Sequence, residues 1–320
     1  MQVKMDPRQL ARQIGAAFPG LEPGKVLQAP IIIVSAPRSG SNLLFEQLAA
    51  IPGFWTIGGE SHAIFRVFPH LRAENPQFDS GGLGETHADA ETAHLLRSCF
   101  LYLLRDARGR PYLDMPASQM PRSICLLEKT PRNALNIPFL LKVFPDARFV
   151  YLHREPGPAV ASLIEAWTLG LQSGRFKTFQ ELPDWDRPGW CFLLPPGWRE
   201  MRGKSLAEIA AFQWSASNRI IIEELASLPV DRWTSVTYEA LVADPQMVLT
   251  DICRFAKIDP GQLHVRSGEL PLSRTTITPP SADKWRKYET EIERLYPSLA
   301  VSARLIERFC SANVDGEQPA

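Results

Sequence analysis

Residues 30–42, with the sequence PIIIVSAPRSGSN, decide the fold class. The β-branched run 31–34 lies between two prolines, which is typical of a short strand buried on both faces. A polar turn at 38–42 follows, and the next stretch, LLFEQLAAI, has helical spacing. A buried strand that leads through a short turn into a helix predicts the first unit of a parallel α/β sheet.

The rest of the chain repeats this alternation. Strands are expected at 124–127, 148–152 and 233–238. The expected helices lie near the N-terminus, around Leu10, Ile14 and Phe18, and at 88–105, 133–144, 159–167, 205–227, 240–256 and 283–295. The pattern predicts a central, mostly parallel sheet with helices on both faces. Ligands of such sheets bind beyond the carboxyl ends of the strands, so we expect the chemistry just after each strand.

The 320 residues are interpreted as one domain at 30–305, between an N-terminal extension at 1–29 and a C-terminal tail at 306–320. The segment 170–204 is too long for a plain connection and predicts an inserted helical or loop lid. The tryptophans of this segment either line an acceptor pocket or pack the loop against the core. These tryptophans are Trp185, Trp190 and Trp198.

Composition excludes several classes of protein. Lys plus Arg and Asp plus Glu each number 35, and a net charge of zero argues against a dedicated nucleic-acid binder. Five scattered cysteines exclude a disulfide scaffold and a zinc knuckle and favour a reduced, cytoplasmic protein. No apolar run approaches the roughly 20 residues that a membrane span needs. The charged start is unlike a signal peptide, and no His/Cys/Asp cluster has the spacing of metal ligands.

The turn after the first strand predicts an anion site. Gly40 lets the backbone approach a phosphate, and Arg38 adds a charged fork. Short hydrogen-bonding side chains at the start of the following helix add to it, namely Ser39, Ser41 and Asn42. An ordinary turn whose serines cap the helix is the alternative interpretation. The nucleotide-triphosphatase signature GxxxxGK[ST] is absent, which argues against a Mg²⁺-dependent nucleotide hydrolase.

A second candidate phosphate site follows the strand at 148–152. The strand leads to Arg154, and Ser162 comes about one turn into the next helix. Both side chains are suited to a second phosphate. Alternatively, Arg154 pairs with Glu155 or another carboxylate at the end of the strand.

The pairing of PRSGSN with the later FVYLHREPGPAVAS resembles the sulfotransferases that use 3′-phosphoadenosine 5′-phosphosulfate (PAPS). Further stretches are similar to this family in the same order, namely LEKTP at 127–131, SVTYEALVADP at 235–245 and Lys284-Trp285. The resemblance covers about residues 30–300 and is closest to tyrosylprotein-type and bacterial polyketide-pathway-type members. It implies a P-loop-like fold of three layers.

The resemblance also implies roles for individual residues. The first loop would hold the 5′-phosphosulfate, and Arg154 and Ser162 would hold the 3′-phosphate. The implied cofactor-binding residues are Arg38, Ser39, Gly40, Ser41, Asn42, Arg154, Ser162, Tyr238, Lys284 and Trp285. Arg38 and Lys129 would stabilise the leaving phosphate oxygen. For Lys129 the alternative is a solvated lysine at the end of a strand.

A carboxylate or imidazole must take the proton of the acceptor hydroxyl. By resemblance, Glu60 after Gly58-Gly59 is the first choice, and pairing with Arg38 is its alternative role. His62 is the second candidate, and the two side chains face the same way only if their segment is extended. Glu128 and His153 come next.

The expected function is transfer of a sulfuryl group from PAPS to a small-molecule or carrier-linked hydroxyl, leaving adenosine 3′,5′-bisphosphate (PAP), without a metal. A P-loop-type small-molecule kinase and a non-catalytic nucleotide-binding module are the alternatives. We expect no nucleic-acid partner and no membrane span, and a homodimer is left open.

Overall fold

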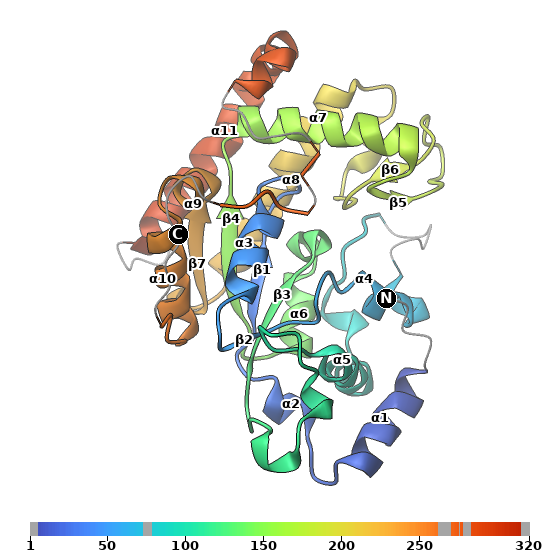
Figure 1. Ribbon diagram of the computed structural model, residues 1–320. Helices are drawn as coiled ribbons and strands as arrows, with labels where there is room; N and C mark the ends of the chain where they lie inside the picture. Colours follow the sequence, from blue (N-terminus) through green and yellow to red (C-terminus); the bar gives the residue numbers. More distant parts are fainter. Residues whose placement is uncertain (1–5, 73–78, 262–269, 275, 278–282, 315–320) are drawn as a thin grey trace.

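Figure 1 shows the computed structural model, which describes residues 6–72, 79–261, 270–274, 276–277 and 283–314. A five-stranded sheet forms its centre in the order β2-β3-β1-β4-β7, with every neighbouring pair parallel. The strands are β1 (Ile31–Val34), β2 (Phe54–Trp55), β3 (Cys125–Lys129), β4 (Arg148–His153) and β7 (Trp233–Thr237). The predicted parallel α/β fold is confirmed.

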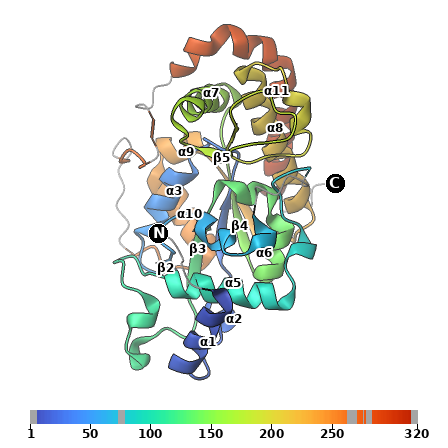
Figure 2. The same cartoon turned by 90° about the vertical axis from the view of Figure 1, so that its right-hand side faces the viewer.

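Alternate residues of β1 divide the core into two layers. Ile31 and Ile33 pack against α3 (Ser41–Ala49), α9 (Tyr238–Ala243) and α10 (Pro245–Ala256). Ile32 and Val34 face the larger cluster on the other side. That side is covered by α5 (Ala90–Leu103), α6 (Ile137–Val143), α7 (Pro156–Ser173) and α8 (Leu206–Ala226). Figure 2 shows α3 and α10 on one side of the strands and α6 on the other.

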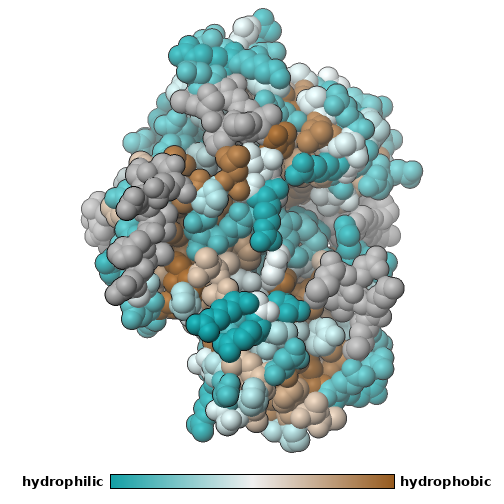
Figure 3. All heavy atoms as spheres, in the orientation of Figure 1, coloured by the Kyte–Doolittle hydropathy of each residue, from teal (hydrophilic) through white to brown (hydrophobic). Residues whose placement is uncertain are grey.

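The remaining elements surround this sandwich. The N-terminal α1 (Pro7–Ala17) packs on α5 through Leu10 and Ile14, as its apolar spacing predicts. Other short elements are α2 (Pro23–Val26), α4 (His62–Arg66), and the antiparallel pair β5 (Lys177–Phe179) and β6 (Trp190–Cys191). On the face seen in Figure 3, hydrophobic residues stand in small groups among hydrophilic ones.

Two predicted helices are broken. The region 133–144 is a 3₁₀ turn (Pro131–Leu135) followed by α6, with Asn136 between them. The region 240–256 divides at Asp244, whose carboxylate accepts the Met247 N–H at 3.0 Å and caps α10. Proline at 245 has no N–H to continue the preceding helix, so α9 ends there. By contrast, α8 begins at the predicted capping box of Ser205 and Glu208.

The predicted C-terminal tail is wrong for residues 306–314. After the 3₁₀ turn Lys284–Tyr288, the last helix α11 runs from Glu289 to Val314. Ile306 and Phe309 are buried, and the Phe309 ring stacks on Trp233 with centroids 4.4 Å apart. These apolar contacts hold the helix against the edge strand β7. Residues 315–320 lie outside the described part of the chain.

The segment predicted as an insertion at 170–204 holds several short elements. Helix α7 continues to Ser173, and β5, β6 and a 3₁₀ turn (Trp198–Met201) follow it. Trp190 and Trp198 are fully buried and contact Trp185, with ring centroids 4.9 to 6.1 Å apart. The tryptophans therefore pack the segment against the core.

Candidate active site

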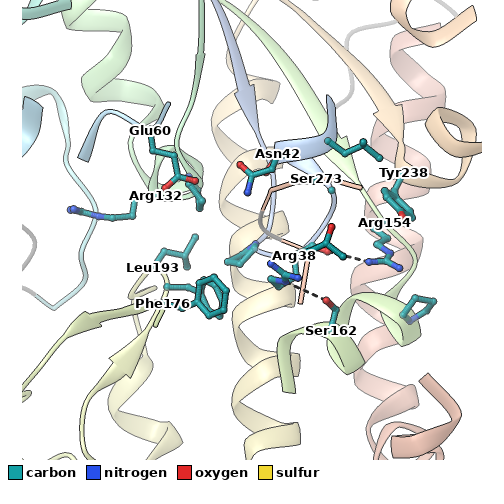
Figure 4. Close-up of a pocket in the computed structure, with 18 of the residues that line it drawn as sticks. Arg38, Asn42, Glu60, Arg132, Arg154, Ser162, Phe176, Leu193, Tyr238 and Ser273 are labelled. Atoms are coloured by element: carbon teal, nitrogen blue, oxygen red, sulfur yellow. Dashed lines mark hydrogen bonds between the residues drawn. The ribbon is translucent and has the colours of Figure 1, made fainter. Parts of the chain in front are cut away.

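A cavity of about 670 Å³ lies where the strands of the sheet end and α7 crosses above them (Figures 1 and 4). Most of the predicted site residues meet there. Those that line it are Arg38, Gly40, Ser41, Asn42, Glu60, His62, Arg154, Ser162, Tyr238 and Trp285. The side chain of Lys284 lies outside the described part of the structure.

The turn at 38–42, which we call the phosphate loop after its predicted role, has two residues in the left-handed region, Arg38 at φ 67° and Gly40 at φ 98°. Gly40 is the N-cap of α3, so the first N–H groups of that helix lie beside this loop without partners inside the helix. A Cβ at Gly40 would collide with the ring of Tyr238. Glycine is therefore required here by conformation and by space.

Two buried polar atoms beside this loop have no hydrogen-bond partner among the described residues. They are Ser39 Oγ and Arg154 Nε. The other end of the Arg154 guanidinium donates to the Arg38 carbonyl at 3.3 Å, and its carbon lies 4.2 Å from the centre of the Tyr238 ring. No carboxylate of the described residues forms a salt bridge with Arg154, which differs from the alternative role at the strand end. Unpartnered donors beside a helix start favour an anionic ligand.

Arg38 is the second cation of this group. Its Nε donates to Ser162 Oγ at 3.3 Å, so Ser162, which was predicted to bind a phosphate together with Arg154, is bonded to Arg38 of the first loop (Figure 4). Burial, with the nearby charges of Arg154 and Arg175, lowers the pKa of Arg38 to about 10. Gathering these guanidinium groups is unfavourable until a negative charge enters.

Opposite the phosphate loop, Lys129 joins the loop to the candidate base. Its ammonium is 2% exposed and donates to the Asn42 side chain and, at 2.6 Å, to Glu60. The other Glu60 oxygen lies 3.2 Å from His62 Nε2. Burial raises the pKa of Glu60, but the His62 hydrogen bond and the charge of Lys129 outweigh it and lower the pKa to about 2. Glu60 therefore pairs with Lys129 and not with Arg38.

The expectation that Glu60 and His62 need an extended segment is wrong, because α4 begins at His62 and the two side chains still meet. Ser61 between them points the other way. Its hydroxyl donates to Glu128 at 2.7 Å, and its N–H donates to Thr130 Oγ1 at 2.8 Å. These buried bonds to β3 fix the turn that carries Glu60 over the cavity.

The two reserve candidates for the base lie elsewhere. Glu128 is buried beneath the site, where it accepts from Ser61, Thr130 and Asn133, and burial raises its pKa. His153 lines a second cavity, 3.6 Å from Cys310 Sγ, and burial lowers its pKa to about 4. Neither lines the cavity that holds Glu60.

The cavity has a further wall that the sequence did not single out. Its members are Arg66, Pro131, Arg132, Phe176, Lys177, Thr178, Phe192 and Leu193. One signal was available for Arg66, which comes four residues after His62 and so lies on the same face of α4. No pattern marks Phe176 or Phe192, which reach the cavity through the β5–β6 pair.

The fold and site define an α/β protein with a loop at the carboxyl edge of its sheet that offers unpartnered hydrogen-bond donors. A model of the sulfotransferase family matches residues 30–188, the part that contains the loop, Glu60, Lys129 and Arg154. Over this part of its length the chain is similar to the sulfotransferase family. No curated protein matches the sequence significantly.

Solved structures of sulfotransferases are similar to the chain. The sulfotransferase domain of the curacin biosynthetic pathway is 19% identical, with a TM-score of 0.42, over 84% of this chain and 98% of that one. A sulfotransferase from Alicyclobacillus acidocaldarius is 16% identical, with a TM-score of 0.47, over 90% and 99%. The domain from the Synechococcus PCC 7002 olefin synthase is 23% identical, with a TM-score of 0.43, over 86% and 96%.

The described residues contain no group of three or more His, Cys, Asp or Glu side chains arranged to hold a metal ion. None of their helices combines the length and apolarity needed to cross a bilayer.

Proposed function

We propose that this protein transfers the sulfuryl group of PAPS to the hydroxyl of a small-molecule or carrier-linked acceptor. The observation that carries the proposal is that Arg154, Arg38 and Glu60 line one cavity, with the buried Lys129 bonded to Glu60 behind its wall. Cations together with a carboxylate suit an anionic donor and a hydroxyl acceptor.

The phosphate loop fits the donor. Ser39 Oγ and Arg154 Nε are buried donors without a partner in the described chain, and the start of α3 adds N–H groups. Arg154 and Ser162 would hold the 3′-phosphate, and residues 38–42 the 5′-phosphosulfate. Tyr238 and Trp285 line the same end and offer apolar faces to the nucleoside.

When bound, PAPS supplies a sulfur that exchanges its bond to the phosphate oxygen for a bond to the acceptor oxygen. Arg38 and Lys129 would stabilise the charge that develops on the leaving phosphate. Glu60 would accept the hydroxyl proton, and His62 would hold the carboxylate in place through its 3.2 Å contact. The adenosine bisphosphate leaves as the second product. Within this proposal, the transferase domain starts at residue 30 and includes the whole of α11, and a cytoplasmic location stays a prediction.

The test is direct. The protein is incubated with ³⁵S-labelled PAPS and a panel of phenols and aliphatic alcohols, and products are analysed by mass spectrometry for an added SO₃. We expect a labelled product in the presence of a chelator, because Arg38 and Lys129 meet the charge of the leaving phosphate. Turnover that required Mg²⁺ and ATP instead would favour the kinase alternative. Tight PAP binding without any transfer would favour a non-catalytic module.

A further inference from the structure

We propose that the acceptor carries an anionic group, a carboxylate or a phosphate, which Arg66 and Lys177 bind at the far end of the cavity. The proposal rests on the proposed function and adds the chemical class of the acceptor. It depends on the half of the cavity away from Arg154 and Tyr238, which we call the acceptor lobe. The acceptor lobe consists of Glu60, His62, Arg66, Pro131, Arg132, Phe176, Lys177, Thr178, Phe192 and Leu193.

Figure 4 shows the division of the cavity. Arg154 and Tyr238 lie on one side, Glu60, Arg132, Leu193 and Phe176 on the other, and Arg38 and Asn42 lie between them. The donor would occupy the first side, where the phosphate loop lies. The acceptor must then enter from the second side to bring its hydroxyl to Glu60.

The charges of the acceptor lobe exceed what the transfer step needs. Among the described residues, the lobe holds three full cations, Arg66, Arg132 and Lys177, and one carboxylate, Glu60. Lys129 already pairs with that carboxylate at 2.6 Å. An excess of positive charge in a partly enclosed cavity attracts an anion.

Two of these cations are available to a ligand. Arg132 is buried and donates to the Gly81 carbonyl at 3.3 Å, so it belongs to the wall. The side chains of Arg66 and Lys177 make no hydrogen bond or ion pair within the described part of the chain. Arg66 comes from α4 and Lys177 from β5, so elements distant in sequence supply the two charges.

Two stacked rings form an apolar part of the wall of the acceptor lobe. The Phe176 and Phe192 rings stack with centroids 5.2 Å apart and an interplanar angle of 24°. Both residues have left-handed backbones, at φ 67° and 64°, and the Phe192 N–H donates to the Phe176 carbonyl at 2.9 Å. Strained residues that meet at a cavity wall point to a functional use of their side chains. The flat face they form suits an aromatic or aliphatic body between the hydroxyl and the anion.

The spacing along α4 sets the length of that body. His62, beside the candidate base, and Arg66 are four residues apart, which is roughly 6 Å along a helix axis. The hydroxyl and the anionic group of the acceptor should therefore stand at opposite ends of its body. A para-substituted phenol meets this requirement, whereas an ortho-substituted one does not.

The experiment compares matched acceptors that differ only in charge. The first pair is 3-(4-hydroxyphenyl)propanoate and its methyl ester, and the second is 4-hydroxyphenyl phosphate and its dimethyl ester. We expect kcat/KM of the charged member to exceed that of the neutral member by about tenfold, as for two partly exposed ion pairs. A preference in the first pair identifies a carboxylate and one in the second pair a phosphate. Equal values within both pairs would overturn the proposal.

Variants assign the preference to the two cations. The double change Arg66→Gln with Lys177→Met should reduce the ratio of charged to neutral kcat/KM to near one, and Arg66→Lys should retain most of it. Arg122→Gln, an exposed arginine outside the acceptor lobe, is the control and should leave the ratio unchanged. A ratio that survives the double change would contradict the assignment.

Calorimetry separates failure of this inference from failure of the proposed function. PAP binding should be nearly the same in the wild type and the double variant, because neither cation lies on the donor side. Turnover of the neutral acceptors without preference for the charged ones would reject only the inference. Absence of any sulfated product from all four acceptors would reject the proposed function and the inference with it.

Discussion

Glu60 and Lys129 show how one ion pair sets the chemistry of the site. Lys129 is almost fully buried, and its ammonium donates to both Asn42 of the phosphate loop and Glu60. Removing one member of a buried pair leaves the other without compensation. Each residue therefore has a structural effect and a proposed catalytic one, and an experiment must separate the two.

For catalysis, we expect Glu60→Gln to lower turnover by about 10²–10⁴-fold, the usual worth of a positioned general base. Glutamine keeps the shape and accepts the Lys129 hydrogen bond but takes no proton at neutral pH. The measurement is steady-state turnover with PAPS, together with PAP affinity, which should change little. If Glu60→Gln stayed active while His62→Ala lost turnover, the base would be His62.

For stability, the low pKa of Glu60 has a defined pH window. A carboxyl whose pKa is lower in the folded protein stabilises the fold above its unfolded pKa and loses this contribution as pH falls. The shift is from 4.5 to about 2, so the loss falls between these values. The difference in unfolding free energy between wild type and Glu60→Gln should shrink as pH drops from 6 toward 2. Urea titrations at several pH values would show it, and a constant difference would contradict it.

Among the elements, α11 is the clearest departure from the predicted organisation. Its polar surroundings in the sequence suggested a tail beyond residue 305, yet Ile306 and Phe309 are buried. The contact that orders them is the stacking on Trp233, which lies in β7 far away in the sequence. No local pattern carries that information.

We expect Phe309→Ala to lower the unfolding free energy by about 3–5 kcal/mol, the usual effect of removing a buried aromatic ring. A chain that ends after residue 305 should be at least as unstable, since it also loses Ile306. A chain that ends after residue 314 is the matched control and should melt like the full protein. Equal melting temperatures for all three shortened or substituted chains would mean that this part of α11 contributes nothing.

Some elements of the fold are determined by neighbouring residues alone, and others depend on distant contacts. Ile31 to Val34 and the Ser205–Glu208 capping box predicted a strand and a helix start because neighbouring residues alone determine them. Phosphate-loop residues were predicted for the same reason. Phe176 and Phe192 were not, because their position in the cavity depends on left-handed backbones and on a pairing across the β5–β6 segment.

In the whole molecule, four parallel strands bring distant loops to one edge. Residues 37, 38 and 40–43 follow β1, Pro131 and Arg132 follow β3, Arg154 follows β4 and Tyr238 follows β7, and all of them line the same cavity. A ligand that bridges these loops binds only the folded chain. Its binding energy therefore adds to the stability of the whole fold.

PAP at 100 times its dissociation constant should raise the unfolding free energy by about 2.7 kcal/mol, whereas ATP at the same concentration should raise it much less. The reason is that ATP lacks the 3′-phosphate that Arg154 and Ser162 are placed to hold. Differential scanning fluorimetry would measure both. Arg154→Ala should remove most of the PAP effect, and equal stabilisation by ATP and PAP would contradict the assignment of these residues.

The bond from Lys129 to Glu60 also has a consequence in time. A leaving phosphate beside Lys129 would compete with Glu60 for the hydrogen bonds that the Lys129 ammonium donates. The pKa of Glu60 would then rise from about 2 toward the range of a useful base. An acceptor that arrives first meets a carboxylate that is still tied to its lysine. The two substrates should therefore act in sequence, donor before acceptor. Product inhibition would reveal this order, with PAP competitive against PAPS and noncompetitive against the acceptor, and random addition would show that Lys129 does not gate the base.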